Sequence, residues 1–386
     1  WKFSSEQVQS FKEYMDKNGL AYADCKQFRL TGNYLRIAFR TQWALMKGVA
    51  SSLKQFRVNR TQLALVRMLP KFVYYYLEKQ LELENVRFGV ELVRDDYNAG
   101  HVINALVCKE HNILTLGIQH TASPYDAPQL AFVEFDRYAM YGELYENLFS
   151  PFWQEQQVEP TGREGLDWVI DIYRDPEYIC GVKKRMEKLY QKRSYTVVIL
   201  FPGVAERCLI SRWEEMYRGL ESVMKMDVDA AVFLRFRSLE HLEYEYTRCF
   251  KDLTEKDERF ILDHENFITQ DLLAVSDLII TPNASLGINE ATAVDKKVLT
   301  FDYTKTAELY FGNYGHDFVM TTSAQVLRAF EGLEDDFKDI DCDWDGLKRS
   351  LNYHCDGKNC ERLRDVIEDM ISSGEAQQAR GAYELR

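Results

Sequence analysis

The chain has 386 residues, 46% hydrophobic and 28% charged, a balance typical of globular proteins and a length sufficient for two domains. Its formal net charge of −13 argues against general nucleic-acid binding. No apolar run approaches the roughly 18 residues that a membrane-spanning helix needs. The eight cysteines are scattered, which is typical of reduced thiols, so we expect a cytoplasmic protein. Because the sequence opens at Trp1 rather than Met, we also expect it to be part of a longer protein.

One segment departs from the acidic balance of the chain. Between Lys26 and Tyr76 there is no Asp or Glu, and basic side chains alternate with aromatic and aliphatic ones. A basic, aromatic-rich segment favours an anionic partner, either the inner face of a membrane touched peripherally through residues 26–71 or a phosphorylated lipid-linked acceptor. The alternative is a helical region whose apolar stripe packs into the core while its basic side is solvated.

The first part of the chain has a helical pattern and then changes character. Apolar spacing predicts helices over residues 4–19, 33–56 and 60–79, with breaks near Val58–Asn59 and at Pro70. From residue 86 the order becomes that of a parallel βαβ unit: strand 87–93, helix 99–110, strand 113–118 and a further strand at 137–141. Turn residues from Pro160 to Gly165 close this half.

The second half repeats the alternation of strands and helices. A helical stretch over 165–192 leads into strands expected at 196–201, 230–236, 260–262, 278–281 and 297–301. Helices are expected between and after them, at 208–226, 239–256, 269–275, 285–294 and 359–373. The continuous apolar runs of these strands are typical of buried parallel sheets.

Two halves of this kind predict an α/β protein with two doubly wound sheets facing a cleft. We expect an N-terminal Rossmann-like domain with a helical extension over residues 1–165, a linker helix over 166–192 and a C-terminal Rossmann-like domain over 193–386. Ligands in such sheets lie at the carboxyl ends of the strands, which selects the loops that follow them.

The strongest local feature is the run from Thr281 to Ala291, where a buried strand ends and a helix begins near Ser285. The free N–H groups of a helix N-terminus suit a phosphate. Ser285 adds a hydroxyl, Gly287 allows close approach, and Glu290 lies one turn further on, positioned for ribose hydroxyls. The alternative is that Asn283 or Ser285 merely caps the helix.

Two more strand ends converge on this edge and complete the expected donor site. An arginine at a strand terminus pairs well with phosphate, although either arginine could instead form a surface salt bridge. The expected donor-binding residues are Pro202, Gly203, Arg235, Arg237, Asn283, Ser285, Leu286, Gly287 and Glu290.

In the first half, three side chains are candidates for catalysis. Asp95 and Asp96 follow one buried strand, and His120 follows the next. A carboxylate facing the cleft could act as general base for an acceptor hydroxyl, with His120 as alternative base or orienting group. The other reading of the two aspartates is N-capping of the helix that starts at Ala99.

No metal or other cofactor is expected. The Asp-x-Asp triplet at 227–229 precedes its strand and so lies away from the ligand edge, and the triplet at 341–343 opens a helix near Trp344. His354, Cys355 and Cys360 lack the close pair spacing of a zinc site. No P-loop or G-x-G-x-x-G follows a strand, which argues against a kinase or a dehydrogenase.

Several motifs together carry a family resemblance. The runs Gly117–His120, Asp136–Glu143 and Val158–Gly162, followed by Asp271–Asp302, resemble in order and spacing the motifs of GT-B glycosyltransferases that build bacterial surface polysaccharides. That group includes the Kdo and polysialic-acid capsule transferases and the teichoic-acid glycerophosphotransferases. The resemblance spans roughly residues 86–310. It implies a GT-B fold of two Rossmann-like domains and a metal-independent glycosyltransferase.

The same resemblance implies roles for individual residues. Asp95 or Asp96 falls at the acidic base, Ser285 at the donor-phosphate serine and Glu290 at the acid that binds ribose. The sequence departs from the pattern where Arg237-Ser238 replaces a His-Pro pair and where Asn283-Ala284-Ser285 replaces a doubled serine; His120 is also followed by Thr121 rather than Gly.

The resemblance implies transfer from a nucleotide-sugar, a CMP-sugar such as CMP-Kdo being favoured, to a surface-polysaccharide or lipid-linked glycan. Two other functions fit the same architecture. A nucleotide-sugar 2-epimerase would bind its nucleotide at a similar Ser–Glu segment but would need no basic acceptor face. A non-catalytic glycan-assembly subunit would bind a nucleotide-sugar without turnover.

Overall fold

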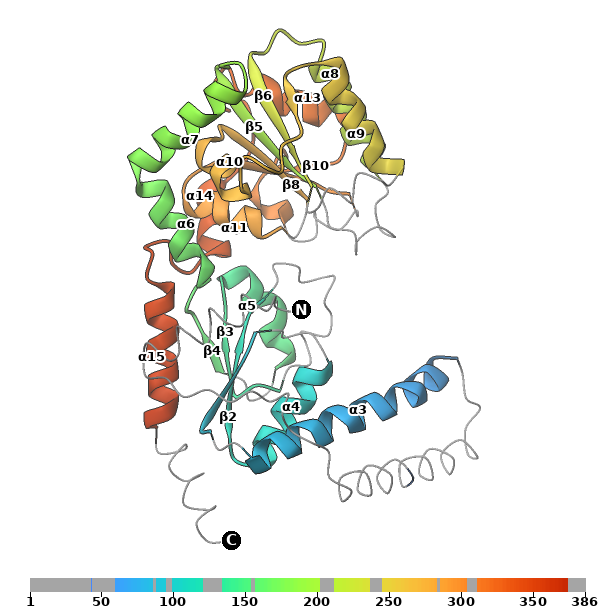
Figure 1. The fold of residues 1–386 in the computed structure, drawn as a ribbon, viewed down its shortest axis with the longest axis vertical. Helices are drawn as coiled ribbons and strands as arrows, with labels where there is room; N and C mark the ends of the chain where they lie inside the picture. The colour runs from blue at the N-terminus through green and yellow to red at the C-terminus, as the bar shows by residue number, and fades with distance from the viewer. Residues whose placement is uncertain are drawn as a thin grey trace. The chain divides into compact units, whose positions relative to one another are not determined.

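The computed structural model describes Trp43 and residues 60–85, 88–94, 99–120, 134–153, 157–201, 212–236, 245–282, 285–303 and 311–373 (Figure 1). The helices expected at 4–19 and 33–56, with most of the basic segment at 26–71, lie outside these residues. The chain forms two compact units, one comprising Trp1–Glu91, Asn98–Thr115 and Met370–Arg386 and the other Leu92–Tyr97 and Leu116–Asp369. The domain boundaries expected at residues 165 and 192 stay predictions.

In the first unit, helix α3 (Arg60–Asn85) packs along helix α4 (Ala99–Glu110). The expected break at Pro70 is wrong, because α3 continues through it. A proline inside a helix removes one backbone hydrogen bond and strains the preceding turn, so α3 continues through Pro70 at a local cost.

A buried charge cluster joins α3 to its neighbours in this unit. Lys79 is 3% exposed and forms ion pairs with Glu82, at 3.0 Å, and with Glu91. The Cys108 thiol of α4 donates to the Glu91 carboxylate at 3.3 Å. These contacts give the buried ammonium its opposite charges, the condition under which a lysine remains charged out of water.

The smaller sheet has the order β1-β2-β3-β4. Its strands are β1 (Val90–Val93), β2 (Leu114–Ile118), β3 (Arg137–Ala139) and β4 (Gln157–Glu159). Strands β2, β3 and β4 run parallel, with Gly117 opposite Tyr138 and Tyr138 opposite Val158. Gly117 is required here, because a Cβ at that position would lie 2.3 Å from the Phe135 ring. Strand β4 lies just before the turn expected from Pro160 to Gly165, and the sequence did not predict this strand.

The larger sheet contains six parallel strands in the order β10-β9-β8-β5-β6-β7. They are β5 (Tyr195–Leu200), β6 (Ala230–Arg235), β7 (Phe260–Ile261), β8 (Leu278–Pro282), β9 (Lys297–Phe301) and β10 (Val319–Met320). The central strands are buried on both faces, which explains their unbroken apolar sequences. Read from β7, the order follows the doubly wound 3-2-1-4-5-6 pattern.

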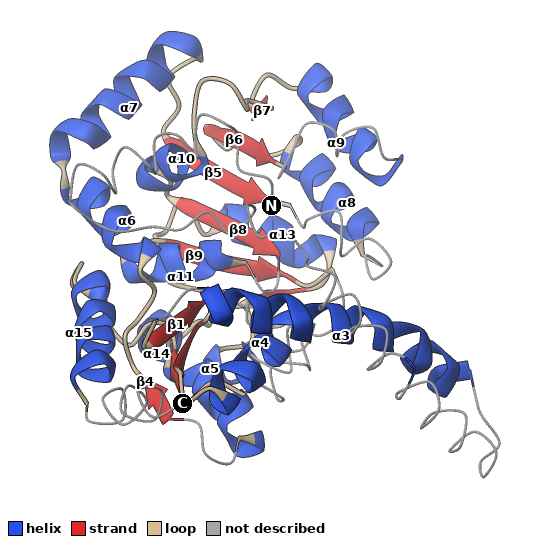
Figure 2. Cartoon of the chain, turned by 60° about the horizontal axis from the view of Figure 1, so that its bottom comes forward, coloured by secondary structure: helices blue, strands red, loops and turns tan. Residues whose placement is uncertain are grey.

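Helices cover both faces of this sheet (Figures 1 and 2). One layer holds α8 (Trp213–Val223), α9 (Glu245–Lys256) and α13 (Ser323–Glu331), in which α13 packs on α8. The other holds α10 (Thr269–Val275), α11 (Leu286–Ala293) and α14 (Trp344–Leu351), in which α14 packs on α11. Gly219 permits the first of these contacts, because a Cβ there would lie 2.6 Å from Val326.

The single linker helix expected over 165–192 is two helices. Helix α6 (Gly165–Arg174) ends before Asp175, and α7 (Pro176–Leu189) begins at the next residue. The Asp175 carboxylate accepts from the backbone N–H groups of Glu177 and Tyr178, and Pro176 occupies the first helical position. Asp-Pro is a strong helix start signal, and it divides the apolar pattern at this point.

Two further helices are described. Helix α5 (Glu143–Phe149) follows β3, and α15 (Asn359–Ser372) closes the described chain. Asp167 of α6 accepts from the backbone N–H groups of Asn359 and Cys360 at 2.9 and 2.7 Å. A carboxylate at this helix N-terminus satisfies N–H groups that have no partner within the helix. No helix in the described ranges has both the length and the apolar character needed to cross a membrane.

Candidate nucleotide-binding site

The strand order places a ligand edge between two strands of the larger sheet. From β5 the chain proceeds outward to β6 and β7, then returns to the other side of β5 as β8. The loops after β5 and β8 therefore diverge, and such a switch point is where ligands bind in doubly wound sheets. All six strands are parallel, so their carboxyl ends lie along one edge. That edge carries the ends of β5, β6 and β8, the positions expected from the sequence.

The N-terminus of α11 lies at this switch point. Ser285 is the N-cap, and its hydroxyl accepts from the Gly287 backbone N–H at 3.1 Å. The capping reading is thus what the geometry shows for Ser285. Gly287 is buried, and a Cβ there would lie 2.7 Å from Leu200 at the end of β5. The glycine therefore lets α11 approach β5 closely, with half-buried Leu286 beside it.

Glu290 is buried one turn into α11 and is not a free acceptor. Its Oε1 lies 2.7 Å from Nη1 of Arg163, which follows β4. Its Oε2 lies 3.4 Å from the Gln270 amide, near the limit of a hydrogen bond. The two charged side chains are only 12% and 6% exposed. Burial lowers the pKa of Arg163, but the opposite charge of Glu290 and its hydrogen bond outweigh that effect, so the pKa of the guanidinium is raised.

Arg235 ends β6 and is tied to the start of α10. Its Nη1 donates to the Asp263 carbonyl at 2.7 Å and its Nε to the Thr269 hydroxyl at 3.2 Å. Thr269 is followed by Gln270, which contacts Glu290. A row of polar contacts therefore runs along the carboxyl edge from Arg235 through α10 and α11 to Arg163.

Asn289, the residue before Glu290 in α11, fixes this helix to other elements. It accepts from the Tyr145 hydroxyl of α5 at 3.0 Å and donates to the Leu351 carbonyl at 2.9 Å. Asn352 donates to the Asn289 carbonyl and to the Thr292 hydroxyl. All of these side chains are buried, so their hydrogen bonds fix one geometry for the helix that carries Ser285 and Glu290.

The remaining expected site residues divide into two groups. His120 lies at the carboxyl end of β2 in the smaller sheet, half-buried, and its neighbour Gln119 accepts from the Tyr141 backbone N–H at 2.9 Å. Six expected residues lie outside the described part of the chain: Asp95, Asp96, Pro202, Gly203, Arg237 and Asn283. Their roles stay predictions.

The structure brings in residues that the sequence interpretation did not select. Arg163, Thr269 and Gln270 complete the polar row, and His264 lies in the loop after β7, beside Arg235. Arg163 directly follows the Thr161-Gly162 turn that carried part of the family resemblance, which was a usable signal. Nothing in the sequence distinguished Gln270 from other polar residues in first helical turns.

The two Asp-x-Asp triplets are structural in the described chain. Asp229 precedes β6 and accepts from the backbone N–H and the hydroxyl of Ser194. Asp343 is the N-cap of α14, as the sequence predicted, and accepts from Gly346 at 2.8 Å. Across the described ranges, no group of three or more His, Cys, Asp or Glu side chains is arranged to hold a metal ion.

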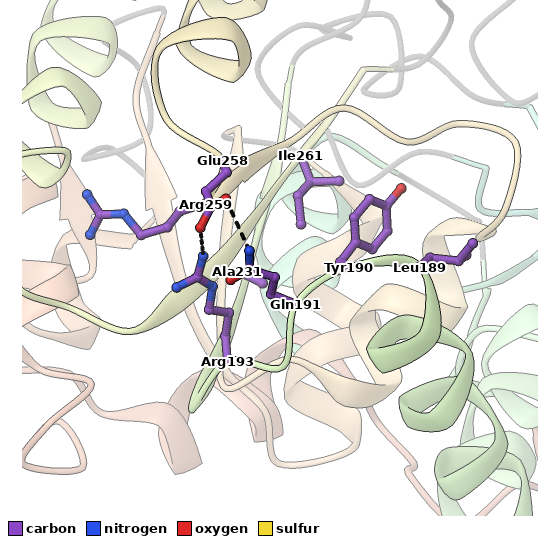
Figure 3. A pocket seen from close by; sticks show the side chains of 8 residues that line it. All are labelled: Leu189, Tyr190, Gln191, Arg193, Ala231, Glu258, Arg259 and Ile261. Carbon is purple, nitrogen blue, oxygen red and sulfur yellow. Dashed lines mark hydrogen bonds and ion pairs between the residues drawn. The ribbon is translucent and has the colours of Figure 1, made fainter.

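A cavity of about 210 Å³ lies at the opposite, amino-terminal edge of the larger sheet (Figure 3). It is lined by residues that precede β5 and β7 and by the second residue of each of β6 and β7. Arg193 and Gln191 both donate to Glu258 across it, at 2.6 and 3.2 Å. Arg259 is committed to Asp257 and to carbonyls at the end of α8, including Met224. These side chains satisfy one another, so this cavity is not the candidate site.

No protein-family model matches the sequence, and no curated protein matches it. Solved structures do match the fold. A structure provisionally assigned as a UDP-N-acetylglucosamine 2-epimerase from Listeria monocytogenes aligns with a TM-score of 0.55 at 13% identity, over 78% of this chain and 80% of that one. The UDP-GlcNAc 2-epimerase from Neisseria meningitidis, bound to UDP-GlcNAc, aligns with a TM-score of 0.54 at 13% identity, over 78% and 82%. A variant of the wall teichoic acid polymerase TagF aligns with a TM-score of 0.50 at 12% identity, over 81% and 76%.

These matches confirm the predicted fold class. The chain is an α/β protein with two open, parallel, Rossmann-like sheets of the GT-B type. At such low identity the likeness concerns the fold alone. The closer resemblance to Kdo and polysialic-acid transferases stays a prediction.

Proposed function

We propose that the chain is a GT-B enzyme that binds a nucleotide-activated sugar at the carboxyl edge of its larger sheet and transfers the glycosyl group to an acceptor. The observation that carries the proposal is the position of α11. Its N-terminus lies at the switch point, with Glu290 buried one turn behind it. The N–H groups of a helix N-terminus suit the donor phosphate. The Glu290 carboxylate is already held by Arg163 and Gln270, and its remaining lone pairs would accept from ribose hydroxyls.

In this proposal the charge of the leaving nucleotide is stabilised without a metal. Arg235, whose guanidinium lies at the end of β6, and the dipole of α11 would supply positive potential where negative charge develops. Asp95 or Asp96, which follow β1 in the sequence, would deprotonate the acceptor hydroxyl, with His120 as the alternative base. We propose that the acceptor is a surface-polysaccharide or lipid-linked glycan and that residues 26–71 contact it or the membrane that carries it.

The fold neighbours bear on the choice of nucleotide. One is a co-structure of S. aureus MnaA with UDP, with a TM-score of 0.53, and another is bound to UDP-GlcNAc. These favour a UDP-sugar over the CMP-sugar expected from the sequence, for which the neighbours give no support. The neighbours with the higher TM-scores include epimerases, so a nucleotide-sugar 2-epimerase is the second candidate.

One incubation separates the two reactions. Purified protein with UDP-GlcNAc in deuterated water, without acceptor, should leave the donor unchanged if the chain is a transferase. Release of UDP should then depend on an added glycan acceptor. Epimerisation needs no acceptor and breaks a C–H bond at C2, so a C2 epimer carrying deuterium would identify an epimerase. Binding without either product would favour a non-catalytic subunit.

A further inference from the structure

We propose that Arg235 and His264 together bind a phosphate group and that His264 takes up a proton when the anion binds. The pair lies at the carboxyl ends of β6 and β7, so the inference deepens the proposed nucleotide-sugar function and rests on it for the identity of the ligand. It assigns a role to His264, which the sequence did not single out.

Arg235 is a cation whose charge is not neutralised within the described chain. Its two hydrogen bonds, to the Asp263 carbonyl and the Thr269 hydroxyl, go to neutral acceptors. Burial lowers the pKa of Arg235, and the more distant charges of Asp263 and Asp271 only partly oppose this effect. A partly desolvated arginine in this condition attracts an anion strongly.

The two nearest carboxylates are committed to other partners. Asp263 accepts from the Tyr190 hydroxyl at 2.5 Å and from the backbone N–H groups of Glu265 and Asn266. Asp271 pairs with Arg185 at 2.7 Å and accepts from the Tyr178 hydroxyl. Neither forms an ion pair with Arg235, which leaves that guanidinium available to a ligand.

His264 adds a buried polar atom next to this cation. Its Nε2 is shielded from solvent and has no hydrogen-bond partner among the described residues. Its backbone is held in place because the preceding carbonyl, that of Asp263, accepts from Arg235. A buried nitrogen without a partner is costly, so such an atom at a ligand edge indicates a place for a ligand group.

The charges around His264 determine its response to an anion. Burial lowers the pKa of His264 and the positive charge of Arg235 lowers it further, while Asp263 opposes them. The imidazole is therefore neutral near neutral pH in the free protein. A phosphate placed between the two side chains screens the repulsion from Arg235 and accepts a hydrogen bond from Nε2, and both effects favour the protonated imidazole. The proton comes from solvent, and no covalent bond is made or broken.

Calorimetry tests this directly on the full chain. Binding of inorganic pyrophosphate and of UDP is measured near neutral pH in two buffers of different ionisation enthalpy, and the difference in heat gives the protons taken up. We expect uptake by the wild type with both ligands. His264→Gln should abolish the uptake and weaken pyrophosphate binding about tenfold, the usual effect of losing one charge-assisted hydrogen bond. Arg235→Gln should weaken it at least as much.

The control is His316→Gln, at an exposed histidine in another loop, which should leave the proton uptake and the affinity for pyrophosphate unchanged. Melting curves establish that each variant is folded. His264→Gln with unchanged affinity and uptake would overturn the inference while leaving the proposed function intact. Proton-linked pyrophosphate binding without binding of any nucleotide would instead contradict the proposed function and leave the His264–Arg235 assignment standing.

Discussion

Arg163 and Glu290 form a mostly buried ion pair, with 2.7 Å between Nη1 and Oε1, although 127 residues separate them in the sequence. The pair joins the loop after β4 to the helix that begins at the switch point. Both partners are needed for the stability of the fold, because removal of one leaves an uncompensated charge in a mostly buried position. Within the second unit, the position of α11 therefore depends on a residue that follows β4.

Arg163→Met should lower the free energy of unfolding by about 3–5 kcal/mol, the usual cost of breaking a buried pair. Arg163→Lys, which keeps the charge, should cost less. The double variant Arg163→Met with Glu290→Met should recover most of the loss, because no lone charge remains buried. Urea unfolding of the set measures the coupling. A single-variant cost below about 1 kcal/mol, the range of exposed pairs, would show that the pair is not buried in solution.

The tight backbone contact at Gly142 predicts a sharp difference between two glycines. A Cβ at Gly142 would lie 2.3 Å from the Leu351 carbonyl carbon and oxygen, and a backbone cannot yield as a side chain does. Gly142→Ala should therefore cost about 1–3 kcal/mol or more. Gly181, inside α7, has nothing within 4 Å of such an atom, so Gly181→Ala should stabilise by about 0.5–1 kcal/mol. If the melting temperatures of both variants lie above that of the wild type, or both lie below it, the result would be inconsistent with this packing.

The hydrogen bond from Tyr145 to Asn289 should be detectable by removing a single oxygen atom. Tyr145→Phe leaves the buried Asn289 oxygen without its donor, which should cost about 1–3 kcal/mol. Tyr74→Phe is the matched control: its hydroxyl bonds to Glu78 at the surface, so its loss should change stability by less than about 0.5 kcal/mol. Equal effects of the two changes would argue that Asn289 has another donor.

Much of the larger sheet could be predicted because the local sequence there favours the same strands and helices that tertiary packing requires. The apolar run at 297–301 and the short helix predicted at 269–275 have the observed bounds of β9 and α10. Where the two disagree, prediction failed: Pro70 lies within α3. Strand β4, Gln157–Glu159, was missed because only one of its three residues is apolar, so no apolar run marks it.

Part of the candidate site's placement could be predicted in the same way. The strand-end rule places Arg235 and Ser285 at the carboxyl edge of the larger sheet, where the structure has them, since the rule depends only on parallel strand order. Their donor-binding roles stay predictions. The partner of Glu290 could not be predicted, because distant segments of the chain are brought together only by the packing of complete layers.

His264 predicts a pH dependence of stability. The pKa of His264 in the folded chain lies below its unfolded value of 6.5, so between these two pKa values the unfolded chain binds more protons than the folded one. The stability is thus complete above pH 6.5 and falls as the pH drops toward the folded pKa. His264→Gln should reduce this slope in denaturant titrations at a series of pH values. The carboxylates of Asp257 and Asp263, whose pKa values are lowered from 3.8, change the stability only in a separate and more acidic pH range. An unchanged slope in His264→Gln would mean that the buried imidazole is not the group responsible.

The most direct test of the account is nucleotide binding at the edge that carries α11. Thermal stability is measured with UDP, CDP, CMP and GDP, with EDTA present, for the wild type, for Glu290→Gln and for Glu258→Gln at the opposite edge of the sheet. We predict that one nucleotide stabilises the wild type, by about 2.7 kcal/mol at a hundredfold excess over its dissociation constant. The effect should be lost in Glu290→Gln and kept in Glu258→Gln. No stabilisation by any nucleotide, or full stabilisation of Glu290→Gln, would contradict the assignment of the donor site.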